Sequence, residues 1–133
     1  MPSILFICVY NACRSQIAEA VFRKLASDSW LVASVGTNPS GRVDPKAIEI
    51  LKKHRLTMNS IKPKGFSSLS TTSWDYIVRM DGGDKCLLIP AKKFIKWDVP
   101  DPEDGPMGLY EALFNDITKR SNDLMRDTGG TTL

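Results

Sequence analysis

The sequence predicts an α/β fold: a single domain with a doubly wound, four-stranded parallel sheet and helices on both faces. A continuous run of β-branched and aromatic residues, Ser3–Val9, opens the chain, which is typical of a strand buried on both faces. An amphipathic segment and a second apolar run follow before Gly36, in the order of a βαβ unit. Helical and strand-like segments then alternate along the rest of the chain.

The elements after the opening strand follow from apolar patterning. Ser15–Ser27 is expected to be a helix, because Ile17, Val21 and Leu25 recur at helical spacing and basic residues stand near its C-terminal end. The second strand is expected at Trp30–Val35, where a short apolar run ends before a glycine. These elements complete the first βαβ unit, whose crossover should be right-handed.

A second helix is predicted at Pro45–His54. Asp44 is a typical N-cap residue, and proline is favoured at the first position of a helix. The apolar residues of this segment, Ala47, Ile48 and Leu51, are expected to be buried.

Two more strands and a last helix complete the predicted domain. The strands are expected at Asp75–Met80 and Phe94–Val99, after the polar segment Ile61–Thr72, which should hold a loop and one short helical turn. Gly108–Met125 is an amphipathic helix, and residues 128–133 are expected to form a flexible tail. The apolar residues expected on the inward face of this helix are Leu109, Leu113, Ile117 and Leu124.

Composition agrees with one globular domain over residues 1–133. A chain of 133 residues, 42% hydrophobic and 25% charged, can build one core and excludes disordered and collagen-like classes. No apolar run approaches a membrane span, and no basic segment or cleavage site marks a signal peptide, so we expect a cytoplasmic protein without a membrane partner. The net charge of +3 does not indicate a nucleic-acid binder. We expect a monomer.

The connection between the first strand and the first helix carries the candidate chemistry. Cys8 ends the strand and Ser15 opens the helix. Backbone N–H groups of such a tight connection lack helical partners and, with the helix dipole, form a site for a tetrahedral oxyanion. We expect Arg14 to bind the same anion and the local positive field to lower the pKa of the Cys8 thiol, which makes it a nucleophile. The loop residues between them are Val9, Tyr10, Asn11, Ala12 and Cys13.

Two loop side chains have expected supporting roles. Ser15 can donate a hydrogen bond to the Cys8 thiolate, and Asn11 can hold the loop through hydrogen bonds to the backbone or through a left-handed turn. The alternative for Cys8 is a core cysteine at a strand end.

Four segments, in order, resemble the low-molecular-weight tyrosine phosphatases and the arsenate reductases that share their fold. LFICVYNACRSQIAEAVF resembles the phosphate loop, and SVGTNPSGRVDPKAIEIL resembles the segment after the second strand. SWDYIVRMDGGDKC resembles the third strand and a cysteine-bearing loop, and KWDVPDP resembles the loop of the general acid. The resemblance covers residues 3–125 and implies the phosphatase-like fold and a cysteine-dependent reaction of an oxyanion.

The resemblance also implies a common first step. The Cys8 thiolate attacks the oxyanion, Arg14 and the loop amides bind its oxygens, and an aspartic acid protonates the departing oxygen. Asp98, Asp101 and Asp104 are the candidates for this acid. Asp101 is preferred because Asp101-Pro102 matches the family's Asp-Pro pair, with an acidic solvated loop as the alternative.

The second step separates the two activities. A phosphatase hydrolyses the cysteinyl phosphate with water, whereas an arsenate reductase needs a second thiol to release arsenite. Ser15-Gln16, Tyr10 and Glu103-Asp104 resemble the reductases. We therefore expect an arsenate reductase acting on arsenate, with a phosphatase acting on phosphotyrosine proteins as the alternative. An inactive module that binds an oxyanion or a partner is the third hypothesis.

The resolving thiol stays open. Relay reductases carry two cysteines after the third strand, whereas this chain has Cys86 alone, with Gly82 or Asp81 at the other position. Cys86 or Cys13 can resolve Cys8. Cys86 can equally be a buried loop residue, and for Cys13 packing under the first helix is preferred to chemistry. The alternative is an external reductant: thioredoxin, glutaredoxin with glutathione, or another low-molecular-weight thiol.

No bound cofactor or metal is expected. His54 is the single histidine and is predicted to lie at a solvated helix end, which gives no metal site. Lys62 and Lys64 are predicted to be surface charges, and the three tryptophans are predicted to lie in the core.

Overall fold

Four parallel strands form the centre of the fold. The computed structural model describes residues 1–57, 62–71, 73–80 and 89–128. The sheet has the order β2-β1-β3-β4, and every pairing in it is parallel. Its strands are β1 (Ser3–Cys8), β2 (Leu31–Gly36), β3 (Trp74–Arg79) and β4 (Ala91–Lys96). The predicted four-stranded α/β sheet is confirmed.

The strand order makes the sheet doubly wound. From β1 the chain passes to β2 on one side and then crosses to β3 on the other side of β1. In register, Cys8 pairs with Gly36 of β2, and Ile7 pairs with Arg79 of β3. The reversal of direction opens a crevice at the carboxyl ends of β1 and β3, which is where doubly wound sheets bind ligands.

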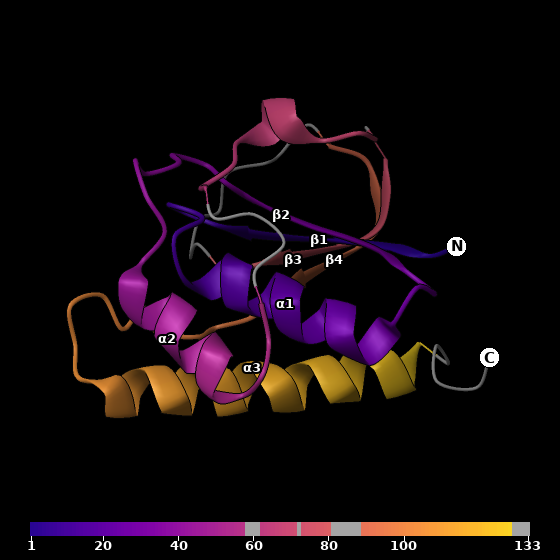
Figure 1. Cartoon of the computed structure of the whole chain (residues 1–133). Coiled ribbons are helices and arrows are strands. Elements are labelled where there is room, and N and C mark those ends of the chain that lie inside the picture. Colours follow the sequence, from indigo (N-terminus) through magenta and orange to yellow (C-terminus); the bar gives the residue numbers. More distant parts are fainter. Residues whose placement is uncertain (58–61, 72, 81–88, 129–133) are drawn as a thin grey trace.

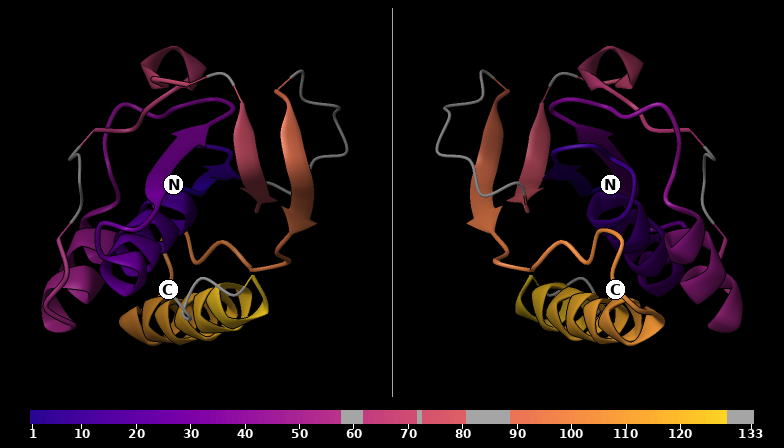
Figure 2. Two further views of the ribbon diagram at one scale, coloured as in Figure 1. Left: turned by 90° about the vertical axis from the view of Figure 1, so that its right-hand side faces the viewer. Right: turned by 90° about the vertical axis from the view of Figure 1, so that its left-hand side faces the viewer.

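Helices cover the sheet unequally on its two faces. The helices α1 (Arg14–Ala26), α2 (Pro45–Lys53) and α3 (Met107–Asp127) lie together on one face, as Figures 1 and 2 show. The 3₁₀ helix η1 (Phe66–Ser68) lies on the opposite face and is the short helical turn predicted between the second helix and the third strand.

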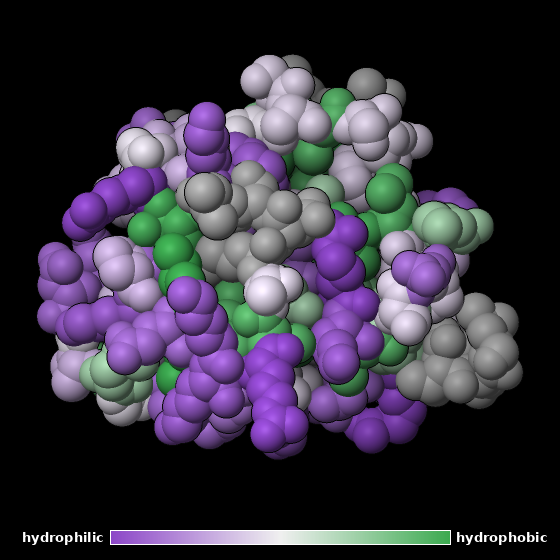
Figure 3. All heavy atoms as spheres, viewed as in Figure 1, coloured by the Kyte–Doolittle hydropathy of each residue, from purple (hydrophilic) through white to green (hydrophobic). Residues whose placement is uncertain are grey.

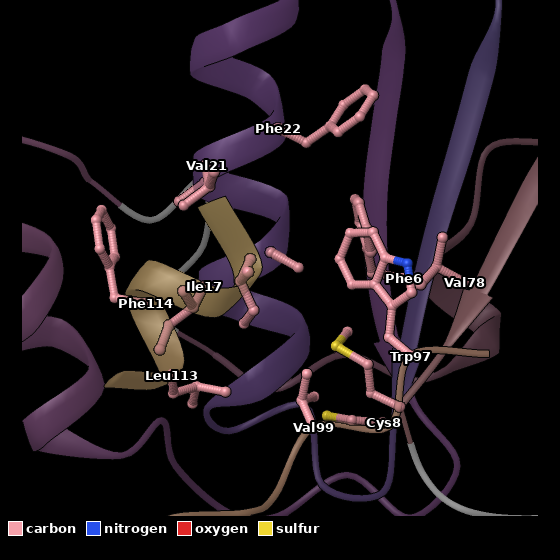
Figure 4. Close-up of a cluster of buried hydrophobic side chains, with 14 of the residues drawn as sticks. Phe6, Cys8, Ile17, Val21, Phe22, Val78, Trp97, Val99, Leu113 and Phe114 are labelled. Atoms are coloured by element: carbon pink, nitrogen blue, oxygen red, sulfur yellow. The ribbon is translucent and has the colours of Figure 1, made fainter. Parts of the chain in front are cut away.

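Two apolar clusters fill the spaces on either side of the sheet. The larger cluster lies between the sheet and the helices and includes Phe6, Phe22 and Trp97, with ring centroids 5.5–5.8 Å from Phe6 (Figure 4). The smaller cluster lies under η1 and includes Leu5 and Ile7. Alternate residues of β1 therefore serve opposite faces, which explains why the whole strand is buried.

The three tryptophans lie in the core, as predicted. Trp30 is 5% exposed, Trp74 is 3% exposed and Trp97 is 6% exposed. Trp97 and Val99 are buried although they follow β4, which ends at Lys96. The fourth strand was predicted three residues too late, because apolar residues of the following loop also pack into the core.

Helix faces differ from the prediction at several apolar positions. In α2 the buried residues are Ala47, Ile50 and Leu51, whereas Ile48 is only partly buried. These three follow the spacing i, i+3, i+4 of one helix face, and Ile48 lies off it. Leu109 is 52% exposed for the same reason, and Leu25 in the last turn of α1 is 39% exposed. The buried stripe of α3 consists of Tyr110, Leu113, Phe114, Ile117, Ser121 and Met125.

Polar side chains cover the outer side of the helical layer. In the space-filling view of Figure 3, hydrophilic residues dominate the area over α2 and α3, and apolar residues show in small areas between them. Within the part of the chain that the structure describes, no helix is long and apolar enough to span a membrane.

Candidate active site

A five-residue loop, residues 9–13, connects the carboxyl end of β1 to the first turn of α1. Its carbonyl groups accept hydrogen bonds from the segment after β2: Asn38 N donates to Val9 O at 2.7 Å, and Asp44 N donates to Ala12 O at 2.9 Å. These contacts fix the loop and occupy carbonyls that would repel an anion. The amide groups and the start of α1 remain the natural anion-binding elements of this loop.

The Cys8 sulfur is held at the bottom of this loop. A hydrogen bond of 2.9 Å joins Cys8 Sγ to Ser15 Oγ, and Asn11 N donates to Cys8 Sγ at 3.3 Å. Cys8 is 2% exposed and belongs to the large apolar cluster, at its end beside Val99 (Figure 4). Hydrogen bonds of this kind stabilise negative charge on a sulfur.

Asn11 organises the loop from a buried position. Its φ of 51° is left-handed, and its exposure is 0%. Its Nδ2 donates to Ser15 Oγ at 2.7 Å and to Ser34 Oγ at 3.0 Å. Its Oδ1 accepts from Gln16 Nε2 at 2.9 Å and from the Lys64 amide at 2.7 Å. The side chain therefore uses both its donors and its acceptor to hold three separate segments around the loop.

A buried carboxylate supports this network, and the sequence analysis missed it. Ser34 Oγ donates to Glu19 Oε1 at 2.5 Å, and Glu19 also pairs with Lys64 at 3.1 Å and with Arg23 at 2.7 Å. The Glu19 side chain is 2% exposed, so its charge requires these partners. Lys64 is 18% exposed and ion-paired, which corrects its prediction as a surface charge. The sequence signal that could have revealed this carboxylate was an acidic residue, Glu19, among the apolar residues of the first helix.

Gly36 is a second residue that sequence reasoning missed. A Cβ at this position would lie 2.7 Å from Val9 O, 2.8 Å from Asn11 N and 2.9 Å from Tyr10 C. The end of β2 therefore touches the loop backbone so closely that a side chain has no room. The sequence signal was a glycine directly after an apolar strand.

Arg14 lies between the strand ends and the loop before α3. Its guanidinium donates to Met80 O at 2.5 Å and to Val99 O at 3.3 Å, and its side chain is 11% exposed. Its second terminal nitrogen lies 3.7 Å from Asp101 Oδ2. The fold thus brings Arg14 and Asp101, which are far apart in the sequence, next to each other.

Cys8, Arg14 and Asp101 line a single pocket of about 330 Å³. Its remaining walls come from the loop, from the segment Ser40–Pro45 and from Glu103 and Asp104. The volume is at the lower end for small-molecule sites. An oxyanion with a small substituent fits such a space.

Asp101 and Asp104 belong to one tight turn. Glu103 N donates to Asp101 Oδ1 at 3.1 Å, and Gly105 N donates to Pro102 O at 2.7 Å. Asp104 also lines the pocket, whereas Asp98, the third candidate acid, is not among the lining residues. Of the three aspartates, Asp101 is the one that pairs with Arg14 in the described part of the chain.

Of the two cysteines predicted to resolve Cys8, the structure describes Cys13. Cys13 is a free thiol, 7% exposed, at the N-cap of α1 and in the wall of the pocket. Burial raises its pKa well above the usual value, and Asp44 and Asp101 raise it further. Cys86, Gly82 and Asp81 lie outside the described residues.

His54 lies at the end of α2, as predicted, and its side chain is 31% exposed, but it also has partners on α3. Its Nε2 lies 2.6 Å from Glu111 Oε2, and its ring stacks on Phe114 with centroids 3.9 Å apart. The contact joins α2 to α3. Across the described ranges, no group of three His, Cys, Asp or Glu residues is arranged to hold a metal ion.

Comparisons with known proteins show which family the chain resembles. The family model described as "Low molecular weight phosphotyrosine protein phosphatase" matches residues 3–130. The chain is 30% identical over 118 residues to arsenate reductase 2 of Staphylococcus haemolyticus, which covers 86% of this chain and 89% of that protein. It is 38% identical over 91 residues to the low molecular weight phosphotyrosine protein phosphatase of Sus scrofa, which covers 59% of this chain and 54% of that protein.

Solved structures show the same fold. An arsenate reductase in the phosphate binding state superposes with a TM-score of 0.84 at 23% identity, covering 96% of this chain and 98% of that chain. The thioredoxin-dependent arsenate reductase of Corynebacterium glutamicum superposes with a TM-score of 0.78 at 30% identity, covering 96% of this chain and 61% of that chain.

Proposed function

The chain belongs to the low molecular weight phosphotyrosine protein phosphatase family, and from this premise we propose that it is a thiol-dependent arsenate reductase. The observation that carries the proposal is that Cys8, Arg14 and Asp101 line one small pocket. The curated arsenate reductases of similar length support the choice of arsenate.

The first step is attack of the Cys8 thiolate on arsenic. Arg14 and the loop amides hold the other oxygens of arsenate and stabilise the charge that develops on them. Asp101 protonates the departing oxygen, so that it leaves as water. The product is a cysteinyl arsenate on Cys8.

The second step reduces arsenic. A second thiolate attacks Cys8 Sγ, the sulfur–arsenic bond breaks, and its electron pair stays on arsenic, which leaves as arsenite. The two sulfurs are oxidised to a disulfide. Since this thiol must be deprotonated, the raised pKa of Cys13 argues against Cys13 in this role. An external thiol donor or Cys86 is the preferred partner, and the thioredoxin-dependent relative supports thioredoxin as one such donor.

Phosphatase activity is the second candidate. The same first step on a phosphate monoester gives a cysteinyl phosphate that water hydrolyses. Tyr10 is 40% exposed and lines the pocket, where it can contact an aromatic ring of a substrate. The mammalian phosphatase relative also favours this activity. In both cases we propose a single-domain cytoplasmic monomer, without a bound cofactor, that meets its substrate in solution.

The deciding experiment measures both reactions with purified protein. Arsenite release is followed with arsenate and either the thioredoxin system or glutathione with glutaredoxin, and phosphate release is followed with an aryl phosphate. The proposal expects arsenite with at least one thiol donor. Aryl phosphate hydrolysis without arsenite under every donor would transfer the assignment to the phosphatase. Cys8→Ser should abolish both reactions, because it removes the nucleophile.

A further inference from the structure

Lys46 connects helix α2 to the loop that carries Asp101. Its ammonium group donates to the carbonyl of Gly105 at 2.6 Å and lies 5.8 Å from the ring centroid of Tyr110. The side chain is partly buried. A charged donor in such surroundings makes a stronger hydrogen bond than a neutral, solvated one.

Gly105 closes the turn in which Asp101 lies. Gly105 N donates to Pro102 O at 2.7 Å, and Glu103 N donates to Asp101 Oδ1 at 3.1 Å. A Cβ at Gly105 would lie 2.9 Å from Pro102 O, so the turn is tight. A contact that holds the Gly105 carbonyl therefore restrains the position of Asp101 through two hydrogen bonds.

The backbone of Lys46 is connected through Asp44 to the loop of residues 9–13. Its backbone N–H donates to Asp44 Oδ1 at 2.9 Å, and Asp44 N donates to Ala12 O at 2.9 Å. Tyr110 donates its hydroxyl to the second oxygen of Asp44. These elements meet at the left end of the molecule in Figure 1, where β1 ends and α2 and α3 begin.

Asp101 has a weak direct restraint from the rest of the site. Its distance to Arg14 is 3.7 Å, longer than a hydrogen bond, and its side chain is 30% exposed. An acid on an exposed loop needs a further fixed contact to stay near the departing oxygen. The Lys46–Gly105 hydrogen bond supplies such a contact.

We propose that Lys46 is a positioning residue that holds Asp101 over the pocket by binding the Gly105 carbonyl. This inference rests on the proposed function, because it assigns Lys46 a part in the protonation that Asp101 performs. The effect should depend on the leaving group. A poor leaving group requires a well-placed acid, whereas a good one departs with little protonation.

The test compares Lys46→Met with Lys52→Met, an exposed lysine changed identically on the same helix. Phenyl phosphate has a poor leaving group, and 2,4-dinitrophenyl phosphate has a good one. Lys46→Met is expected to lower kcat/KM for phenyl phosphate, which reports the step in which the leaving group departs, by about tenfold, a part of the full effect of a general acid. It should change kcat/KM for the dinitrophenyl ester by less than about twofold. Lys46→Arg should restore most of the loss, and Lys52→Met should match the wild type.

An equal loss with both substrates would overturn the inference, because a general disturbance of the pocket affects them alike. Inhibition by inorganic phosphate checks the pocket directly and should stay within about twofold of the wild type.

A readout without turnover separates this inference from the proposed function. If the wild type neither reduces arsenate nor hydrolyses aryl phosphates, the proposed function fails; if it reduces arsenate alone, the proposed function holds and the leaving-group comparison does not apply. In either case, NMR relaxation of the Gly105 backbone amide in the same variants tests the hydrogen bond between Lys46 and the Gly105 carbonyl directly. Increased motion in Lys46→Met, but not in Lys52→Met, supports the restraint, and unchanged motion in both overturns it.

Discussion

At the scale of single residues, the site depends on close contacts that tolerate little change. Asn11 has the left-handed backbone that the loop requires, and Gly36 leaves the room that the loop backbone occupies. Neither residue is placed to react with a substrate. Their effect is to fix the groups around Cys8, and the cost of disturbing them should appear as lost oxyanion binding.

Gly36→Ala is expected to weaken oxyanion binding by at least about tenfold and to destabilise the protein by roughly 1–3 kcal/mol, since the added methyl group would lie 2.7 Å from Val9 O. Titration with inorganic phosphate and urea unfolding measure the two effects. Gly108→Ala is the matched control, because a Cβ at Gly108 meets nothing within 4 Å. Equal behaviour of the two variants would contradict the tight contact.

Cys13 should react slowly with thiol reagents at neutral pH. Burial raises its pKa, and two carboxylates raise it further, so the reactive thiolate forms only at alkaline pH or after unfolding. Iodoacetamide labelling of the Cys8→Ser variant, followed by peptide mass spectrometry, measures Cys13 separately from Cys86. Rapid labelling of Cys13 at pH 7 in the folded protein would show that this pKa is not raised.

At the scale of elements, α2 is attached to α3 through a charged cluster. Glu111 of α3 accepts hydrogen bonds from Lys53 at 2.6 Å and pairs with His54 at 2.6 Å. Both contacts lower the pKa of Glu111 below its usual value of 4.5, and the hydrogen bond from Lys53 has the larger effect. The N-cap residue Asp44 at the other end of α2 lines the pocket. The contacts of Glu111 therefore help to hold the helix that carries this part of the pocket wall.

The contribution of Glu111 to stability should depend on pH. A carboxyl group with a lowered folded-state pKa stabilises the protein above its unfolded pKa, and this contribution disappears as the pH falls through the folded pKa. Glu111→Gln should therefore be less stable than the wild type at pH 7, and the difference should shrink at pH 3. Urea unfolding at both values measures it, with the exposed Glu49→Gln on α2 as the control. A difference that is independent of pH would exclude the ionised pair as its source.

At the scale of the whole molecule, the pocket lies where the strand order reverses. The loop after β1 faces the segment after β2 and the loop before α3, so elements from the whole chain converge on one end of the sheet. A ligand bound there contacts several of them at once. Its binding should therefore stabilise the entire fold.

Inorganic phosphate should raise the free energy of unfolding. A ligand that binds only the folded state at about one hundred times its dissociation constant adds about 2.7 kcal/mol. Urea unfolding in phosphate, against sodium chloride of equal ionic strength, measures the gain. Arg14→Met should remove most of it, because the guanidinium lines the pocket. A gain that survives in Arg14→Met would place phosphate at another site.

Local patterns predicted most of the fold. The apolar runs of β1 and β2 and the loop between β1 and α1 are contiguous in the sequence, and the structure has them within one or two residues of the predicted bounds. The prediction for Lys64 was wrong and the prediction for His54 missed its contacts, for one physical reason. Their partners Glu111 and Glu19 are 57 and 45 residues away along the chain, so no local pattern shows the pairing.

The sequence by itself determined where the loop after Cys8 lies, because Cys8 to Ser15 form one short connection between a strand and a helix that both have clear local patterns. Only the tertiary structure decided what surrounds that loop. The sheet order brings Asp101 beside Arg14, Gly36 against the loop backbone, and Lys46 onto the turn of Gly105. Contacts between distant segments arise only when the core is packed, since burial selects which segments meet.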